Sequence, residues 1–99
     1  VVAVDIDEAA AARAATEVGG QARAVDVTDE AAVRDLYDGV AAELGRVDVA
    51  FNNAGISPPE DDSILDTGLE IWDRVQRVNL TSVYLCSRAA LRHMVPAGP

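Results

Sequence analysis

Strand-like and helix-like stretches alternate along this chain, and the alternation limits the folds open to it. Residues 1–5, VVAVD, are short, apolar and β-branched, as strands buried on both faces of a sheet are. Residues 8–18 are rich in alanine, the strongest helix former, and Gly19 and Gly20 follow as a stop signal. Residues 22–27, ARAVDV, are the next strand candidate.

The alternation continues through the middle of the chain. Thr28 is placed to cap a helix and Gly45 to end it. Between them apolar residues recur every three or four positions and predict one buried stripe, formed by Val33, Leu36, Val40 and Leu44. Residues 47–51, VDVAF, are the third strand candidate, and residues 57–66, with two prolines, predict an irregular loop.

A long helix is expected over residues 68–94. Thr67 and Glu70 are three residues apart and fit a capping box at its start. Pro96 is expected to end it, because proline has no N–H and clashes with the preceding turn. The order β-α-β-α-β-loop-α predicts one α/β domain over residues 1–99, with a doubly wound parallel sheet of three strands and three helices.

Composition excludes several classes of partner. The formal net charge of −9 would repel phosphates, so we expect no nucleic acid or anionic membrane at the surface. No apolar run approaches the roughly 20 residues that span a bilayer, and no signal peptide is visible. The single cysteine, Cys86, cannot form an internal disulfide, which fits a cytoplasmic protein. All eight basic residues are arginine and alanine is abundant, which indicates a bacterial coding bias.

Polar or small residues stand at the end of each predicted strand. These are Asp5, Asp26 and the run Asn52-Asn53-Ala54-Gly55. Each alone has a structural explanation, because Asp caps helices and forms turns and Asn-Gly starts loops. Together they lie where open α/β sheets bind ligands, beyond the carboxyl ends of the strands.

The chain resembles the short-chain dehydrogenase/reductase family over its whole length. The resemblance is carried by the stretches VVAVDID, AVDVTD, VDVAFNNAG and RVNLTSVYLCSRAAL.

The resemblance implies a partial Rossmann fold and an oxidoreductase. Such an enzyme transfers hydride between a nicotinamide cofactor and a small carbonyl or alcohol substrate, as 3-oxoacyl-carrier-protein reductases and alcohol, sugar or steroid dehydrogenases do. Asp5 would accept hydrogen bonds from both adenosine ribose hydroxyls. A 2′-phosphate would face this carboxylate and that of Asp7, which favours NAD over NADP.

The remaining site residues are also assigned by the resemblance. Ile6 would flank the adenine, Asp26 would accept from its amino group, and the Val27 amide would donate to its ring. Asn53, Ala54 and Gly55 would line the ribose and pyrophosphate side. No metal ligand set is expected.

Asn79 matches the family's catalytic asparagine, which holds a water of the proton relay. Because Val78 and Leu80 flank it, we expect Asn79 to be buried beside a water-filled pocket. An exposed asparagine in a helix would have no such meaning.

Several family features are absent, so we expect an internal piece of a longer protein that is inactive alone. There is no TGxxxGxG loop, and Tyr-x-x-x-Lys is excluded because the chain has no lysine. Tyr84 and Arg88 imitate its spacing, but an arginine cannot shuttle protons as a lysine does. The alternative is a non-catalytic dinucleotide-binding relative that serves as a sensor or scaffold.

The long helix is apolar around most of its circumference, so it needs more than one packing partner. The resemblance implies a homodimer or homotetramer through residues 68–94, although another helix of the parent protein could cover that face instead. In the family one more strand lies between residues 1–5 and 47–52. We therefore expect unpaired backbone there, and weak stability for the chain by itself.

Overall fold

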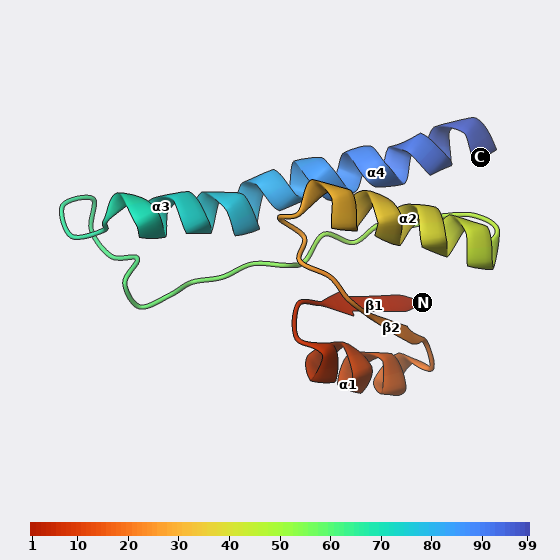
Figure 1. Ribbon diagram of the computed structural model, residues 1–99, viewed down its shortest axis with the longest axis horizontal. Coiled ribbons are helices and arrows are strands. Elements are labelled where there is room, and N and C mark those ends of the chain that lie inside the picture. The colour runs from red at the N-terminus through yellow and green to blue at the C-terminus, as the bar shows by residue number, and fades with distance from the viewer.

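The computed structural model describes all residues, 1–99, and it is an α/β structure. Its elements are β1 (Val2–Asp5), α1 (Glu8–Val18), β2 (Gln21–Ala24), α2 (Glu30–Leu44), α3 (Leu69–Gln76), the π-helical turn η1 (Arg77–Thr81) and α4 (Ser82–Ala97). Figure 1 shows that α3, η1 and α4 form one long helix, with α2 packed along α4 and the β1-α1-β2 unit below. The predicted α/β class and the three helical bodies are confirmed.

The β1-α1-β2 unit follows directly from its local sequence. Asp7 caps α1 by accepting hydrogen bonds from the N–H groups of Ala9 and Ala10. Gly19 ends the helix with φ 64°, and a Cβ on Gly20 would lie 2.3 Å from the carbonyl oxygen of Val1. A side chain at position 20 is therefore excluded where β2 turns in beside β1.

The two strands pair in parallel, with Val2 opposite Gln21 and Asp5 opposite Ala24. Strand β2 is shorter than the predicted 22–27 stretch. Burial on both faces, expected for residues 1–5, is wrong, because β1 is only half-buried at its start and exposed at its end. Only α1 packs against this small sheet to any extent, so much of its surface is open.

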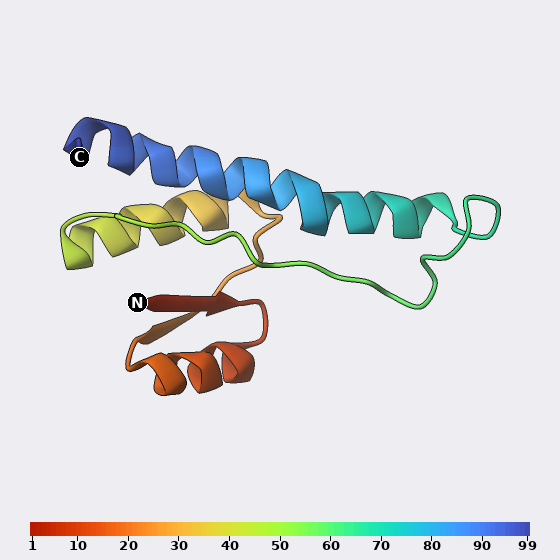
Figure 2. The same ribbon diagram turned by 180° about the vertical axis from the view of Figure 1, so that it is seen from behind.

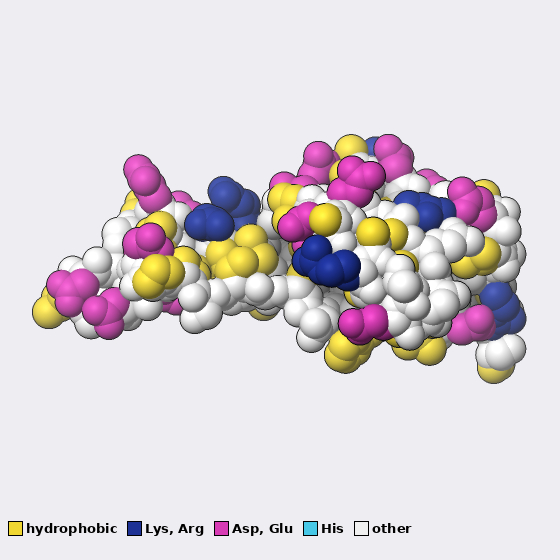
Figure 3. Space-filling model, turned by 90° about the horizontal axis from the view of Figure 1, so that it is seen from below, with side chains coloured by type: hydrophobic (Ala, Val, Ile, Leu, Met, Phe, Trp, Pro, Cys, Tyr) yellow, Lys and Arg dark blue, Asp and Glu magenta, His cyan; other side chains and the backbone are white.

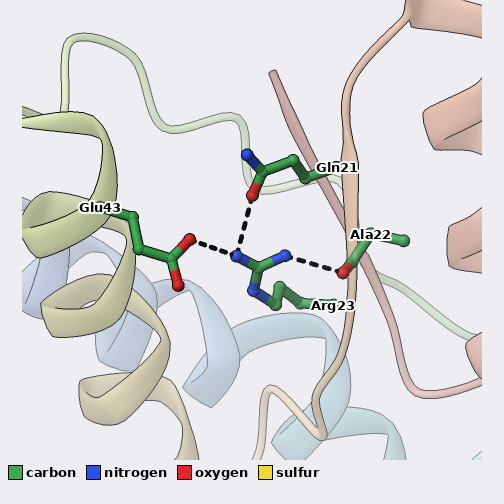
Figure 4. A network of polar contacts seen from close by, with 4 residues as sticks. All are labelled: Gln21, Ala22, Arg23 and Glu43. Carbon is green, nitrogen blue, oxygen red and sulfur yellow. Dashed lines mark hydrogen bonds and ion pairs between the residues drawn. The ribbon is translucent and has the colours of Figure 1, made fainter.

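Helix α2 begins one residue later than predicted. Asp29, not Thr28, is the N-cap, and its carboxylate accepts from Ala32 N–H at 3.1 Å. An ion pair of 2.7 Å between Arg23 and Glu43 joins β2 to α2. Figure 4 shows the same guanidinium donating to the side chain of Gln21 and the carbonyl of Ala22.

The predicted third strand, residues 47–51, is wrong. A strand is defined by its ladder, and the sheet contains only β1 and β2. Residues 47–51 make no backbone–backbone hydrogen bond because no strand lies alongside them. Figure 2 shows this stretch as part of the extended coil between α2 and the loop before α3.

The long helix differs from its prediction at both ends. Gly68 is the N-cap, and the Thr67 hydroxyl instead accepts from Asp62 N–H at 2.9 Å, so the capping box is wrong. At the other end the helix continues through Pro96 to Ala97. Proline removes one bond in the final turn only, and Gly98 N–H reaches the carbonyls of Met94 and Val95.

A small core lies between α2 and α4. Val33, Cys86 and Ala89 are buried there, and Val25, Val27, Tyr37 and Leu85 pack around them. Burial raises the pKa of the Cys86 thiol and also that of Tyr37. Because only 8 of 99 residues are buried, this core holds α2 to α4 but leaves most of the chain exposed.

Candidate functional site

Asp5 lies at the carboxyl end of β1, and one of its two carboxylate oxygens makes no hydrogen bond. Its Oδ1 accepts from Asp7 N–H at 2.9 Å, whereas Oδ2 makes no hydrogen bond. The Asp5 carbonyl accepts from Val25 N–H at 3.0 Å, which carries the parallel pairing one step beyond β2. The next residue, Ile6, is 70% exposed, so its apolar side chain is open to solvent just after the end of β1.

Asp26 follows β2 and is held by one neighbour. Its Oδ1 accepts from both the N–H and the hydroxyl of Thr28, at 2.9 and 2.7 Å. These two bonds lower the pKa of Asp26, and the positive charge of Arg77 adds to the effect against a small desolvation penalty. Asp26 Oδ2 is free, and Val27 N–H has no hydrogen-bond partner.

Because β1 and β2 are parallel and in register, Asp5 and Asp26 leave the sheet at the same edge. Two carboxylates, each with one oxygen available as an acceptor, therefore follow adjacent strand ends. This edge of the sheet is the place where open α/β folds bind their ligands.

Asn53, Ala54 and Gly55 are exposed and form no hydrogen bonds. Each side of this tripeptide is attached to the long helix. On one side Asn52 Nδ2 donates to Ser87 Oγ at 3.2 Å. On the other, Ile56 N–H donates to Asn79 Oδ1 at 2.7 Å and Asn79 Nδ2 donates to the Ile56 carbonyl at 2.9 Å.

Asn79 is exposed, so the expected burial is wrong. It lies in the π-helical turn η1, where an extra residue widens the helix, and such turns are frequent at functional sites. Both polar atoms of its side chain bind the backbone of Ile56. The amide is thus satisfied by the chain itself, and no buried pocket is needed for it.

The structure groups the predicted residues into two sets, one at the ends of β1 and β2 and one along the long helix. No hydrogen bond joins Asp5 or Asp26 to the tripeptide 53–55. Sequence reasoning missed Ser87. Its spacing of eight residues from Asn79, about two helical turns, is the only signal that could have pointed to it.

Other side chains singled out in the sequence have structural partners. Tyr84 is 58% exposed, and its hydroxyl accepts from Arg88 at 2.7 Å. Nε2 of His93 lies 2.8 Å from Oδ1 of Asp38 in α2. No group of three potential ligands could hold a metal ion. No helix here is both long and apolar enough to cross a bilayer, and the cytoplasmic location stays a prediction.

The geometry defines an open α/β protein whose polar groups gather at the carboxyl ends of parallel strands. The profile described as "Enoyl-(Acyl carrier protein) reductase" matches residues 1–99. Cis-4-hydroxycyclohexanecarboxylate dehydrogenase of Sinomonas cyclohexanicum is 44% identical over 102 residues, covering 99% of this chain and 41% of that protein. Meso-2,3-butanediol dehydrogenase of Serratia marcescens is 41% identical over 78 residues, covering 77% of this chain and 30% of that protein.

A solved structure agrees with these relatives. The crystal structure of a short-chain type dehydrogenase/reductase from Mycobacterium marinum matches with a TM-score of 0.86 and 36% identity, over 98% of this chain and 40% of that one. The chain belongs to the short-chain dehydrogenase/reductase family, which confirms the resemblance. It spans about two fifths of the length of the Sinomonas and Mycobacterium proteins.

Proposed function

We propose that the parent protein uses NAD to transfer hydride between the nicotinamide and a small carbonyl or alcohol substrate. The names of two relatives support the substrate class, because both are dehydrogenases of hydroxyl compounds. In this proposal the chain supplies the adenosine side of the cofactor site and one member of the catalytic machinery, Asn79.

The observation that carries the proposal is the pair of carboxylates at the shared edge of β1 and β2. The free Oδ2 of Asp5 is an acceptor of the kind that ribose hydroxyls need, and that of Asp26 suits the adenine amino group. The unbonded Val27 N–H is a donor for the adenine ring, and the exposed Ile6 offers it an apolar contact. These donors, acceptors and apolar contacts are the kinds that an adenosine needs, which supports the proposal.

Charge favours NAD over NADP. No arginine forms an ion pair with Asp5 or Asp7, so no paired cation offsets their charge at this edge. A 2′-phosphate placed on the ribose would meet that charge and be repelled. Figure 3 shows acidic side chains over both the thick part and the narrow arm of the molecule, in keeping with the net charge of −9.

The remaining site residues position the cofactor. Asn53, Ala54 and Gly55 present small or polar groups and free backbone atoms along the pyrophosphate side, while the bound dinucleotide supplies the hydride. Asn79 holds Ile56 and thereby the end of this tripeptide. Although Asn79 is exposed, its place in η1 and its two bonds to Ile56 set it apart from an ordinary exposed helical asparagine, and they support a role in the proton relay.

We also propose that the parent protein is a homodimer or homotetramer through the long helix. One stripe of this helix exposes large apolar side chains over its whole length, and soluble proteins seldom leave such a surface uncovered. The stripe consists of Leu69, Trp72, Leu80, Tyr84, Leu91 and Val95.

Asp5→Asn in the parent protein tests the cofactor proposal. The asparagine keeps the Oδ1 acceptor for Asp7 N–H but removes the charge, so folding should be unaffected. We expect wild type to bind NAD more tightly than NADP by calorimetry. The variant should bind NAD about tenfold more weakly than wild type, which is the effect expected from the loss of one charge-assisted hydrogen bond. Its affinity for NADP should be no lower than that of wild type.

Asp35→Asn is the matched control, because Asp35 is exposed on α2 and makes no hydrogen bond or ion pair. It should leave both affinities unchanged. Tighter binding of NADP than NAD by wild type would contradict the NAD assignment. Tight NAD binding without turnover of any alcohol or carbonyl compound would favour the non-catalytic alternative.

A further inference from the structure

Every hydrogen bond made by residues 49–57 ends on one of two side chains of the long helix. These residues form no backbone–backbone hydrogen bond. Asn52 is bound by Ser87, and Ile56 is bound twice by Asn79. The helix therefore holds this stretch at two points, of which the family's catalytic asparagine is only one.

The distance between the two attachment points is similar on the helix and on the stretch that it holds. Asn79 and Ser87 are eight residues apart, about 12 Å along a helix at 1.5 Å per residue. Asn52 and Ile56 are four residues apart, about 13 Å along an extended chain at 3.3 Å per residue. An extended stretch between Asn52 and Ile56 therefore matches the two helical positions. It runs antiparallel to the helix, because the earlier residue binds the later helical position.

The residues between the two points are the ones proposed to face the cofactor. Asn53, Ala54 and Gly55 have no hydrogen bonds of their own, so their conformation depends on the two ends. The end at Gly55 is close to the helix, because a Cβ there would lie 3.4 Å from Asn79 Oδ1. At the other end, the bond to Ser87 is the one hydrogen bond that Asn52 makes within residues 1–99, and it fixes the side chain of Asn52 on the helix.

We propose that Ser87 is a positioning residue for the cofactor site. Its half-buried hydroxyl accepts from Asn52 and, together with Asn79, keeps the tripeptide 53–55 extended along the pyrophosphate side. The effect on NAD binding rests on the proposed function. The effect on the order of the tripeptide does not.

Ser87→Ala and Ser87→Thr in the parent protein separate the hydroxyl from the rest of the side chain. In the cofactor-free protein, NMR order parameters of residues 53–55 should fall in Ser87→Ala and recover in Ser87→Thr. The dissociation constant for NAD should rise about three- to tenfold in Ser87→Ala, the range expected for one hydrogen bond. Thr16→Ala is the control, because it removes a hydroxyl that bonds only within α1, to Ala12.

A double-mutant cycle with Asn52→Ala tests whether Ser87 acts through Asn52. The double variant should bind NAD no more weakly than Asn52→Ala alone, whereas additive losses would overturn the proposal. Unchanged order parameters of residues 53–55 in Ser87→Ala would also overturn it. So would order parameters in Ser87→Thr that are as low as those in Ser87→Ala. If Ser87→Ala does not fold, Asn52→Ala must show the loss of order by itself. Failure of wild type to bind NAD would contradict the proposed function and leave the order-parameter result to decide on Ser87.

Discussion

The pKa of Asp26 is lowered because Thr28 donates two hydrogen bonds to one oxygen of its carboxylate. Its pKa is lowered in the folded protein, so the charged form contributes stability above the unfolded pKa of about 4. That contribution is lost as the pH falls from about 4 through the folded pKa. Thr28→Val removes the hydroxyl bond and should raise the pKa of Asp26 towards its ordinary value.

The measurement is an NMR titration of the Asp26 carboxyl group in wild type and Thr28→Val. Thr16→Val is the control, since its hydroxyl bonds to the Ala12 carbonyl of α1 and touches no carboxylate. Equal Asp26 pKa values in wild type and Thr28→Val would show that the hydroxyl does not hold the charged form.

The contact between Thr28 and Asp26 also explains why the N-cap of α2 lies at Asp29, one residue after the predicted Thr28. Thr28 and Asp29 are both good N-cap residues, and the sequence does not rank them. In the structure Asp26 engages both donors of Thr28, so the cap falls to Asp29, whose backbone is extended at φ −94°. Helix α1 was predictable to the residue because Asp7 has no such competitor and Gly19 ends it.

At the scale of the element, the start of α2 depends on Asp29. Asp29→Ala removes the acceptor for Ala32 N–H and should lower the free energy of unfolding of the parent protein by about 1 kcal/mol in urea. Asp35→Ala removes an equal charge from the exposed middle of α2 and should change it by much less. Equal losses in the two variants would mean that charge, not capping, is responsible.

Strands were harder to predict than helices, for a physical reason. A helix satisfies its backbone within its own sequence, so α1 and α2 are visible in the pattern of alanines and apolar stripes. A strand needs a neighbour, and residues 47–51 have the composition of a strand without one. The site divides in the same way: the carboxylates at the strand ends were predictable, whereas the contact of Asn52 with Ser87 depends on how the coil lies on the helix.

The whole molecule is more open than a folded domain of its size. Its radius of gyration is 15.1 Å, where about 13 Å is usual for this length. Its accessible surface is 6784 Å², where about 5,400 Å² is usual for a monomer of this mass. The excess lies over residues such as Phe51, Leu65 and Val95, each exposed by 70% or more, so hydrophobic burial stabilises this chain less than a compact domain.

The chain of residues 1–99, produced alone, should therefore unfold without a sharp transition. Its β1-α1-β2 unit and its α2–α4 pair share few buried side chains, so heat should melt them over a broad range and at different temperatures. Circular dichroism at 222 nm and calorimetry are the measurements, and the two methods should give different midpoints. The parent protein is the control, because in the proposed assembly further strands and subunits cover the open edges and make its unfolding cooperative. One narrow transition with coincident midpoints for residues 1–99 would mean that the core of Val33, Cys86 and Ala89 is enough to couple both parts.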